Sequence, residues 1–190
     1  RKRMSSFLIN IIAFKIAWLA SVLGGANELP LLGPAAVIVA VAIHLRLVKE
    51  PSREMLLIFS TGMVGITVDS AMISAGLLSY STGTVVPGMS PLWILGMWLL
   101  FATTFNVSFR WLQSKLLLAA ALGAVFGPLS YYSGSKIGAV TLNEPVAAMI
   151  ALAITWGMIL PGMLELARRL NRTGMETSGN PIRTTEERTL

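Results

Sequence analysis

The chain contains no cysteine and few charged residues. Without cysteine there are no disulfide bonds, no thiolate nucleophiles and no cysteine-ligated metals. Familiar site signatures are missing too: there is no phosphate-binding Gly-Lys-Ser/Thr loop, no G-x-S-x-G elbow and no H-E-x-x-H motif. The single histidine stands without a second histidine or an acidic ligand cluster, so we expect neither a metal nor a cofactor.

Hydrophobic residues make up 54% of the 190 residues, whereas charged residues make up only 13%. The mean hydropathy of +0.70 is far above that of a soluble domain and indicates a membrane protein. A net charge of +6 would also suit a nucleic-acid-binding protein, but the basic residues stand between apolar runs rather than on one soluble face. We therefore expect membrane lipids as partners and no nucleic acid, and leave open a second copy of the chain or a membrane partner protein.

Six apolar runs approach or reach the length of about 20 residues that a helix needs to cross about 30 Å of hydrocarbon. Short connectors rich in Gly, Pro, Ser and Asn separate these runs. The sequence therefore predicts an all-α integral membrane protein with six transmembrane helices. The predicted spans are Phe7–Gly25, Leu31–Val48, Met55–Leu78, Leu92–Phe109, Leu116–Tyr132 and Val146–Ala167.

Lysine and arginine are concentrated on alternate connectors, as the positive-inside rule requires of correctly placed spans. One side of the membrane receives thirteen of the fifteen basic residues, the other side receives Lys136, and Lys15 lies inside the first span. An even number of spans with both termini cytoplasmic follows. The thirteen are Arg1, Lys2, Arg3, Arg46, Lys49, Arg53, Arg110, Lys115, Arg168, Arg169, Arg172, Arg183 and Arg188.

The two ends of the chain carry further signals. Basic residues, an apolar core and Gly-Gly-Ala before Asn27 imitate a cleavable signal peptide, but Lys15 interrupts that core, so we favour a retained first span. Residues 171–190 are polar, contain Gly and Pro, and lack periodicity. They predict a disordered cytoplasmic tail that follows a six-helix transmembrane domain of residues 1–170.

Polar residues inside the predicted spans are candidate functional groups, because such residues are costly to keep in hydrocarbon. Counted by helical rise from the expected cytoplasmic ends, the depths of Lys15 and Asp69 differ by about 6 Å, which a lysine side chain can bridge. We therefore expect these two residues to pair. The strongest polar candidates are Lys15, His44, Asp69, Asn106 and Arg110.

The third span carries a row of small residues beside Asp69. Gly62, Gly65 and Gly76 recur on the same helical face as Asp69, and small residues there allow close approach of a neighbouring helix. Asp69 then has two interpretations. It is either a structural polar contact in a packing seam, which we favour, or a carboxylate that handles protons or substrate.

The fifth apolar segment has the most unusual composition. Gly123 and Gly127 form a small-residue ridge suited to tight packing, and Pro128 is expected to break the helix. One interpretation is a broken or re-entrant helix that lines a cavity. The favoured alternative is an ordinary span that ends at residues 128–132 and is followed by a loop.

The expected cytoplasmic ends of the second and fourth spans are also polar. Thr103, Asn106 and Arg110 follow i, i+3, i+7 spacing, which predicts one helical face and a polar cleft open to the cytoplasm. Arg110 has the alternative role of reaching lipid phosphates. His44 is either a hydrogen-bonded interfacial histidine, which we favour, or a proton relay. Asn10 and Glu54 lie near the same interface.

Three stretches carry a family resemblance: "GITVDS", "PLWILGMWLLFATTFNVSFRWL" and "GAVFGPLSYYSGSKIGA". On these stretches the chain resembles an uncharacterised family of small polytopic bacterial inner-membrane proteins, catalogued as a domain of unknown function, over most of Asn10 to Ala167. The resemblance implies location in the bacterial inner membrane, and proteins similar to this one often accompany fatty-acid-modifying and lipid-associated genes. Members usually carry glutamine where this chain has Lys15, so the Lys15–Asp69 pair departs from the family pattern. The resemblance implies no catalytic residue.

Three functional hypotheses follow, and the sequence leaves open whether the protein is an enzyme. The leading one is a membrane-lipid-associated accessory or enzyme-like protein, in which Asp69, His44, Asn106 and Arg110 form an intramembrane polar cleft. The second is a small proton-coupled transporter or channel that uses Asp69 and Lys15. The third is a structural membrane scaffold whose polar groups only fix helix packing.

Overall fold

The computed structural model describes residues 2–178, and these form an all-α bundle with one short strand pair. Helix formation follows the six apolar runs of the sequence. The elements are α1 (Lys2–Ala26), α2 (Leu32–Leu47), α3 (Pro51–Ser74), β1 (Leu78–Ser79), α4 (Leu92–Ala102), the short 3-10 helix η1 (Arg110–Leu112), α5 (Leu116–Ile137), β2 (Thr141–Leu142) and α6 (Pro145–Ser178).

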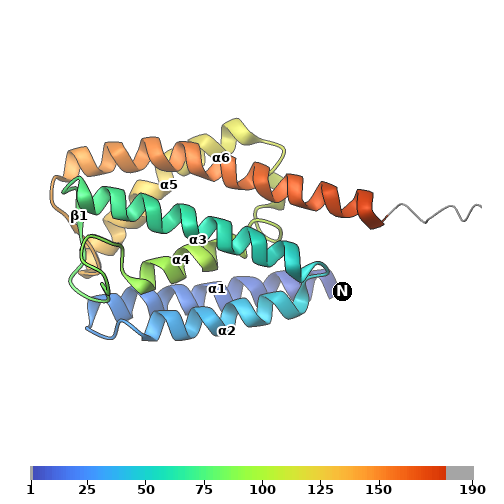
Figure 1. The fold of residues 1–190 in the computed structure, drawn as a ribbon, viewed down its shortest axis with the longest axis horizontal. Helices are drawn as coiled ribbons and strands as arrows, with labels where there is room; N and C mark the ends of the chain where they lie inside the picture. Colours follow the sequence, from blue (N-terminus) through green and yellow to red (C-terminus); the bar gives the residue numbers. More distant parts are fainter. Residues whose placement is uncertain (1, 179–190) are drawn as a thin grey trace, which may run out of the picture.

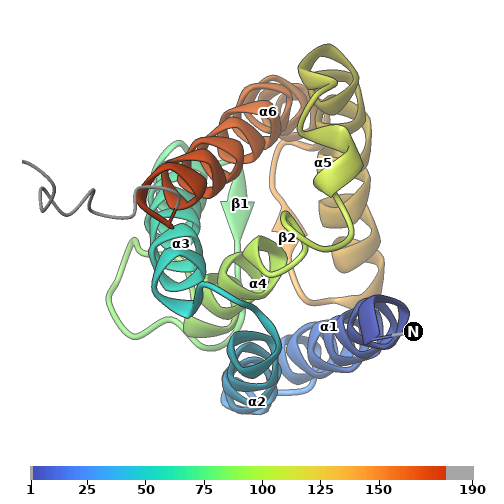
Figure 2. The same ribbon diagram turned by 90° about the vertical axis from the view of Figure 1, so that its right-hand side faces the viewer.

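Consecutive helices run back and forth along one direction, and α4 lies in the middle of the bundle (Figures 1 and 2). The most extensive helix pairs are α5 with α6, α1 with α2, and α3 with α4. The central helix α4 also packs against α1 and α2. Contacts between α1 and α5 are few, so these two helices meet only loosely along one side of the bundle.

Four of the described helices are long and apolar enough to cross a membrane, which makes the chain a multi-pass membrane protein. The other two helices are shorter, with 16 residues in α2 and 11 in α4. Helices therefore form at all six predicted spans, but within residues 2–178 only four reach the length of a full crossing. The four are Phe7–Ala26, Pro51–Ser74, Leu116–Ile137 and Pro145–Arg172.

The fourth predicted span, Leu92–Phe109, is wrong at its second end, because α4 stops at Ala102. The amides of Thr103, Thr104 and Phe105 donate to carbonyls three residues back instead of four. The two threonine hydroxyls also donate to nearby carbonyls, those of Leu100 and Phe101, at 2.7 and 2.6 Å. This tightening ends the α-helix, and the chain turns through η1 into α5.

The fifth span extends further than expected. Pro128 lies inside α5, which continues to Ile137 and ends where Gly138 adopts a left-handed conformation with φ of 87°. Neither the predicted end at residues 128–132 nor a break in the helix is present. One proline removes only one backbone hydrogen bond, and in the middle of this apolar helix the loss is offset by packing, since Pro128 is buried.

The sixth helix is also longer than predicted. The final apolar run is expected to end at Ala167, whereas α6 continues to Ser178. The first part of the predicted disordered tail, residues 171–178, is therefore helical in the structure. Residues 179–190 of that tail lie outside the described part of the chain.

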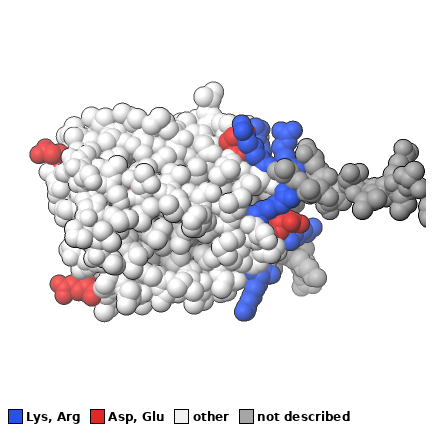
Figure 3. All heavy atoms as spheres, in the orientation of Figure 1, with Lys and Arg blue, Asp and Glu red and all other residues white. Residues whose placement is uncertain are grey.

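The two ends of the bundle differ in charge and in how they are closed. Lysine and arginine gather at the end where α2 joins α3 and where α6 leaves the bundle, which we call the basic end (Figure 3). At the opposite end β1 pairs with β2 in an antiparallel ladder, Leu78 opposite Leu142. The Asn143 amide donates to the Gly76 carbonyl at 3.0 Å and strengthens this link between the loops before α4 and α6.

The predicted glycine seams meet large side chains of neighbouring helices. A Cβ atom on Gly62 would overlap Leu99, and one on Gly65 would overlap the Trp98 ring, both in α4. Gly76 does not belong to this seam, because α3 ends at Ser74 and Gly76 lies in a turn with φ of 70° and open space around it.

Gly123 and Gly127 of α5 both lie against Trp156 of α6. A side chain at Gly123 would meet the Trp156 backbone, and one at Gly127 would meet its indole ring. The absence of side chains at these two positions explains how α5 and α6 approach closely over their length.

We expect Gly65→Ala to lower the free energy of unfolding by about 1–3 kcal/mol, because the new methyl group displaces the buried Trp98 ring. The thermal unfolding midpoint in detergent measures the change. The control is Gly162→Ala, at a helical glycine with nothing within 4 Å of the added Cβ. Alanine suits a helix better than glycine by about 0.5–1 kcal/mol, so the control should hold or raise the midpoint. Equal losses in both variants would contradict the packing role of Gly65.

Candidate functional site

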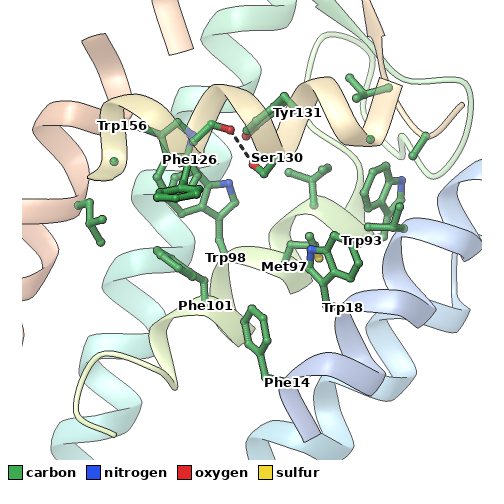
Figure 4. A pocket seen from close by; sticks show the side chains of 18 of the residues that line it. Phe14, Trp18, Trp93, Met97, Trp98, Phe101, Phe126, Ser130, Tyr131 and Trp156 are labelled. Atoms are coloured by element: carbon green, nitrogen blue, oxygen red, sulfur yellow. Dashed lines mark hydrogen bonds between the residues drawn. The ribbon is translucent and has the colours of Figure 1, made fainter. Parts of the chain in front are cut away.

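A cavity with a volume of about 400 Å³ lies between α1, α4, α5 and α6. Four of the five tryptophans line it, together with four phenylalanines and two tyrosines. Figure 4 shows Phe14 and Trp18 of α1 pointing toward side chains of α4, α5 and α6. The aromatic lining is Phe14, Trp18, Tyr80, Trp93, Trp98, Phe101, Phe109, Phe126, Tyr131 and Trp156.

Aromatic rings in the cavity wall contact one another and are held in fixed orientations. Trp98 stacks on Trp156 with ring centroids 4.6 Å apart, and Phe101 meets Trp156 edge-on at 5.4 Å. Tyr80 meets Trp93 edge-on at 5.6 Å near the other end of the cavity. Offset and edge-on ring pairs of this kind stabilise a wall of fixed shape.

Asp69 lies directly behind this wall, with none of its surface exposed. The Trp98 indole N–H donates to Asp69 Oδ2 at 2.7 Å. The Tyr80 hydroxyl donates to Oδ1 at 2.9 Å, and the Tyr131 hydroxyl lies 2.9 and 3.1 Å from the two oxygens. All three donors line the cavity, so one buried carboxyl group of α3 fixes three aromatic side chains of the wall.

The donors around Asp69 are neutral groups. Burial raises the pKa of the Tyr80 hydroxyl well above its usual value, and the Asp69 charge raises it further. Tyr80 therefore keeps its proton and donates a hydrogen bond to Asp69. No lysine, arginine or histidine among the described residues pairs with Asp69. Hydrogen bonds from these three donors stabilise the buried carboxyl group in place of a counter-charge.

The predicted pairing of Lys15 with Asp69 is therefore wrong. The depth estimate treats the two helices as neighbours, but α3 packs against α4, and α4 separates it from α1. Asp69 is sealed behind aromatic rings, whereas the Lys15 side chain is exposed on the surface of α1. Similar depth along the membrane normal does not bring two side chains together when they face different neighbours.

A second polar cluster lies near the basic end and is centred on His44 and Glu54. His44 Nε2 lies 3.2 Å from Glu54 Oε2, and both side chains are buried. The Asn10 amide nitrogen lies 3.3 Å from His44 Nδ1 and also donates to the Thr103 carbonyl at 3.3 Å. Both ring nitrogens of His44 therefore have a side-chain partner, Asn10 at Nδ1 and Glu54 at Nε2.

Three amide side chains extend this cluster to the α4–α5 connection and to α6. Asn106 donates to Glu54 Oε1 at 2.6 Å and accepts from Gln113 at 2.9 Å and from Asn171 at 2.8 Å. The cluster therefore ties together α1, α2, α3, α6 and the segment that follows α4. Its residues are Asn10, His44, Glu54, Thr103, Asn106, Gln113 and Asn171.

The predicted cleft of Asp69, His44, Asn106 and Arg110 does not form as one site. His44 and Asn106 are brought together through Glu54, but Asp69 lies in the other polar cluster, next to Tyr80 beyond the far end of α3. Arg110 is exposed and takes no part in either cluster. Because α4 ends at Ala102, Thr103, Asn106 and Arg110 do not share a helical face.

Sequence reasoning missed the aromatic donors Tyr80, Trp98 and Tyr131 and the central place of Glu54. A buried carboxylate needs donors, and tryptophan or tyrosine at a similar depth is a signal that could have suggested them. The described residues include no group of three or more His, Asp or Glu side chains that could hold a metal ion. The mostly apolar and aromatic lining of the cavity suits it to enclosing an apolar molecule.

A family model described as "Protein of unknown function (DUF2878)" matches residues 7–162 of the chain. Because the match covers most of the chain, the protein belongs to this family, and the resemblance seen in the sequence is confirmed. No curated protein and no solved structure matches the chain.

We expect Tyr131→Phe to lower the free energy of unfolding by about 1–3 kcal/mol, because it takes one donor from the sealed Asp69 carboxyl group. The matched control is Tyr132→Phe, which removes a hydroxyl from the next residue of α5, where the side chain is exposed. Thermal unfolding in detergent compares the two variants. Similar midpoints for both variants would contradict the role of the Tyr131 hydroxyl in holding the cavity wall.

Proposed function

We propose that this member of the DUF2878 family binds the hydrocarbon chain of a membrane lipid inside its helix bundle. The aromatic cavity, which adjoins the membrane-facing surface of α5, is the observation that carries this proposal. It makes the protein a membrane-lipid-associated accessory protein. Its volume falls in the range of about 300–1,000 Å³ that is common for small-molecule pockets.

An empty cavity of this size would destabilise the folded protein. Side chains that line an unfilled apolar cavity of about 400 Å³ lose the van der Waals contacts that an occupant would supply. Water is a poor occupant, because the wall is almost entirely apolar and a buried water needs about 2–4 polar partners. A hydrocarbon chain matches the wall and removes the cost of the void.

The position of the opening supports a lipid as the occupant. Phe126 is 63% exposed and Ser130 is also exposed, although both line the cavity, so they mark its rim on α5. Phe14 and Trp18 of α1 form the opposing side. We call the opening between these four residues the lateral mouth. Since α1 and α5 are both apolar enough to span a membrane, the mouth faces hydrocarbon.

The distribution of basic residues and the packing of α4 support a finer topology. We propose that all six helices are inserted in a bacterial inner membrane with both termini cytoplasmic, in agreement with the basic residues gathered at one end (Figure 3). The short helix α4 lies in the middle of the bundle (Figure 2), and residues 103–105, which follow it directly, are buried in protein. Protein shielding of this kind is how irregular backbone is tolerated at membrane depth.

The two other hypotheses have less support. Proton-coupled transport would need a path between Asp69 and Lys15. Asp69 is instead enclosed by three aromatic donors, and Lys15 is exposed on another helix. A purely structural scaffold accounts for the two polar clusters but gives no reason for a large cavity. Binding is favoured over catalysis, because the cavity wall contains no nucleophile paired with a base among the described residues.

The test is to purify the protein from membranes and to measure bound lipid by native mass spectrometry, comparing Ser130→Trp with Ser133→Trp. Both serines are exposed on α5 and donate to a carbonyl within that helix, at 2.7 Å for Ser130 and 2.8 Å for Ser133. Only Ser130 lines the cavity. We expect Ser130→Trp to block the mouth and to weaken lipid binding about tenfold, equal to about 1.4 kcal/mol, whereas Ser133→Trp should bind as the unmodified protein does.

Two results would count against the proposal. Absence of bound lipid in the unmodified protein would remove lipid binding and leave the scaffold hypothesis. Equal lipid retention in both tryptophan variants would show that any bound lipid sits on the outer surface rather than in the cavity.

A further inference from the structure

Lys15 is an exposed cation near the middle of an apolar helix. The apolar stretch of α1 runs from Phe7 to Ala26, and Lys15 lies about 12 Å along the axis from its first residue. A lysine at this depth is costly unless it has an anionic partner or reaches an interface. The polar clusters at Asp69 and His44 do not include it.

The position of Lys15 around the helix axis places it beside the lateral mouth. Phe14, Trp18 and Val22 line the cavity and form one stripe of α1. At about 100° per residue, Lys15 lies about 20° from Val22 and about 60° from Trp18 around the axis. It therefore stands at the edge of the lipid-exposed stripe, next to the stripe that lines the cavity.

No protein anion reaches this position. Lys15 forms no ion pair, hydrogen bond or ring contact with another residue in the described part of the chain. Helices α4 and α5, which face α1 across the cavity, contain no aspartate or glutamate. Asp69, at the far side of the cavity wall, is fully buried. Since no protein anion is within reach, a bound molecule is the remaining source of an anionic partner for Lys15.

We propose that Lys15 binds the carboxylate of a long-chain carboxylic acid whose hydrocarbon chain occupies the aromatic cavity. The inference rests on the proposed function and adds the chemistry of the ligand's polar end. In this arrangement the chain enters between Trp18 and Phe126, and the carboxylate stays at the mouth opposite the ammonium group. A charge-assisted hydrogen bond to the carboxylate satisfies both ions at once.

A carboxylate fits the depth of Lys15 better than a phosphate ester does. A phosphodiester carries its charge at every physiological pH and stays at the membrane interface. A carboxylic acid can enter hydrocarbon in its neutral form and become a carboxylate beside a cation. A single acyl chain also suits one cavity, whereas a phospholipid would have to leave its second chain outside.

The experiment measures quenching of tryptophan fluorescence by stearic acid brominated in mid-chain and by its methyl ester. It uses the full chain with Trp111→Phe, because Trp111 is exposed and is the one tryptophan that does not line the cavity. We expect both ligands to quench, with the acid binding about tenfold more tightly than the ester. Lys15→Met should remove this preference and leave ester binding unchanged, whereas Lys15→Arg should keep the preference.

The control variant is Lys49→Met, which removes an exposed cation from the α2–α3 connection and should leave the preference intact. If neither ligand quenches, chain binding itself fails, and the proposed function fails with it. If the ester binds as tightly as the acid, or Lys15→Met keeps the preference, the role of Lys15 is overturned while the proposed function stands. Displacement of the brominated acid by hexadecyl phosphate at lower concentration than by palmitate would overturn the assignment of a carboxylate.

Discussion

The Asp69 carboxyl group is the constraint on which the cavity depends. A buried carboxyl group must have its oxygens satisfied, and here the donors come from three separate segments of the chain. Tyr80 precedes α4, Trp98 lies within it, and Tyr131 lies on α5. By fixing these rings, one polar residue on α3 sets the shape of an apolar wall that it does not itself line.

The cavity exists because the central helix α4 is short and carries large side chains. Trp98 and Phe101 of α4 fill the middle of the bundle. Trp98 stacks on Trp156 and Phe101 meets it edge-on, which holds α6 at a distance set by ring size. After Ala102 the chain leaves the helical path, so no further turn of α4 fills the space toward the basic end. Tight glycine contacts bring α5 close to α6, which leaves the side facing α1 open.

Two polar clusters close the bundle at different levels. The Asp69 cluster holds α3, α4 and α5, and the His44–Glu54 cluster holds α1, α2, α3, α6 and the connection after α4. Neither cluster joins α1 directly to α5. The lateral mouth lies at the boundary between α1 and α5, which neither a polar cluster nor a glycine seam fixes within residues 2–178. In the proposed topology this boundary faces hydrocarbon. Lys15 stands at its edge.

The sequence by itself determined the class of protein, the six helical runs and the concentration of basic charge at one end. These features depend on local composition, since any apolar run of sufficient length forms a helix in a membrane. It also singled out Asp69 and His44, because polar groups in apolar runs are visible without a structure. Only the tertiary structure decided their partners: Trp98 and Tyr131 lie 29 and 62 residues from Asp69 in the sequence. Equal depth suggested Lys15 as a partner, but helix packing decides which side chains face each other, and packing depends on contacts that local pattern does not contain.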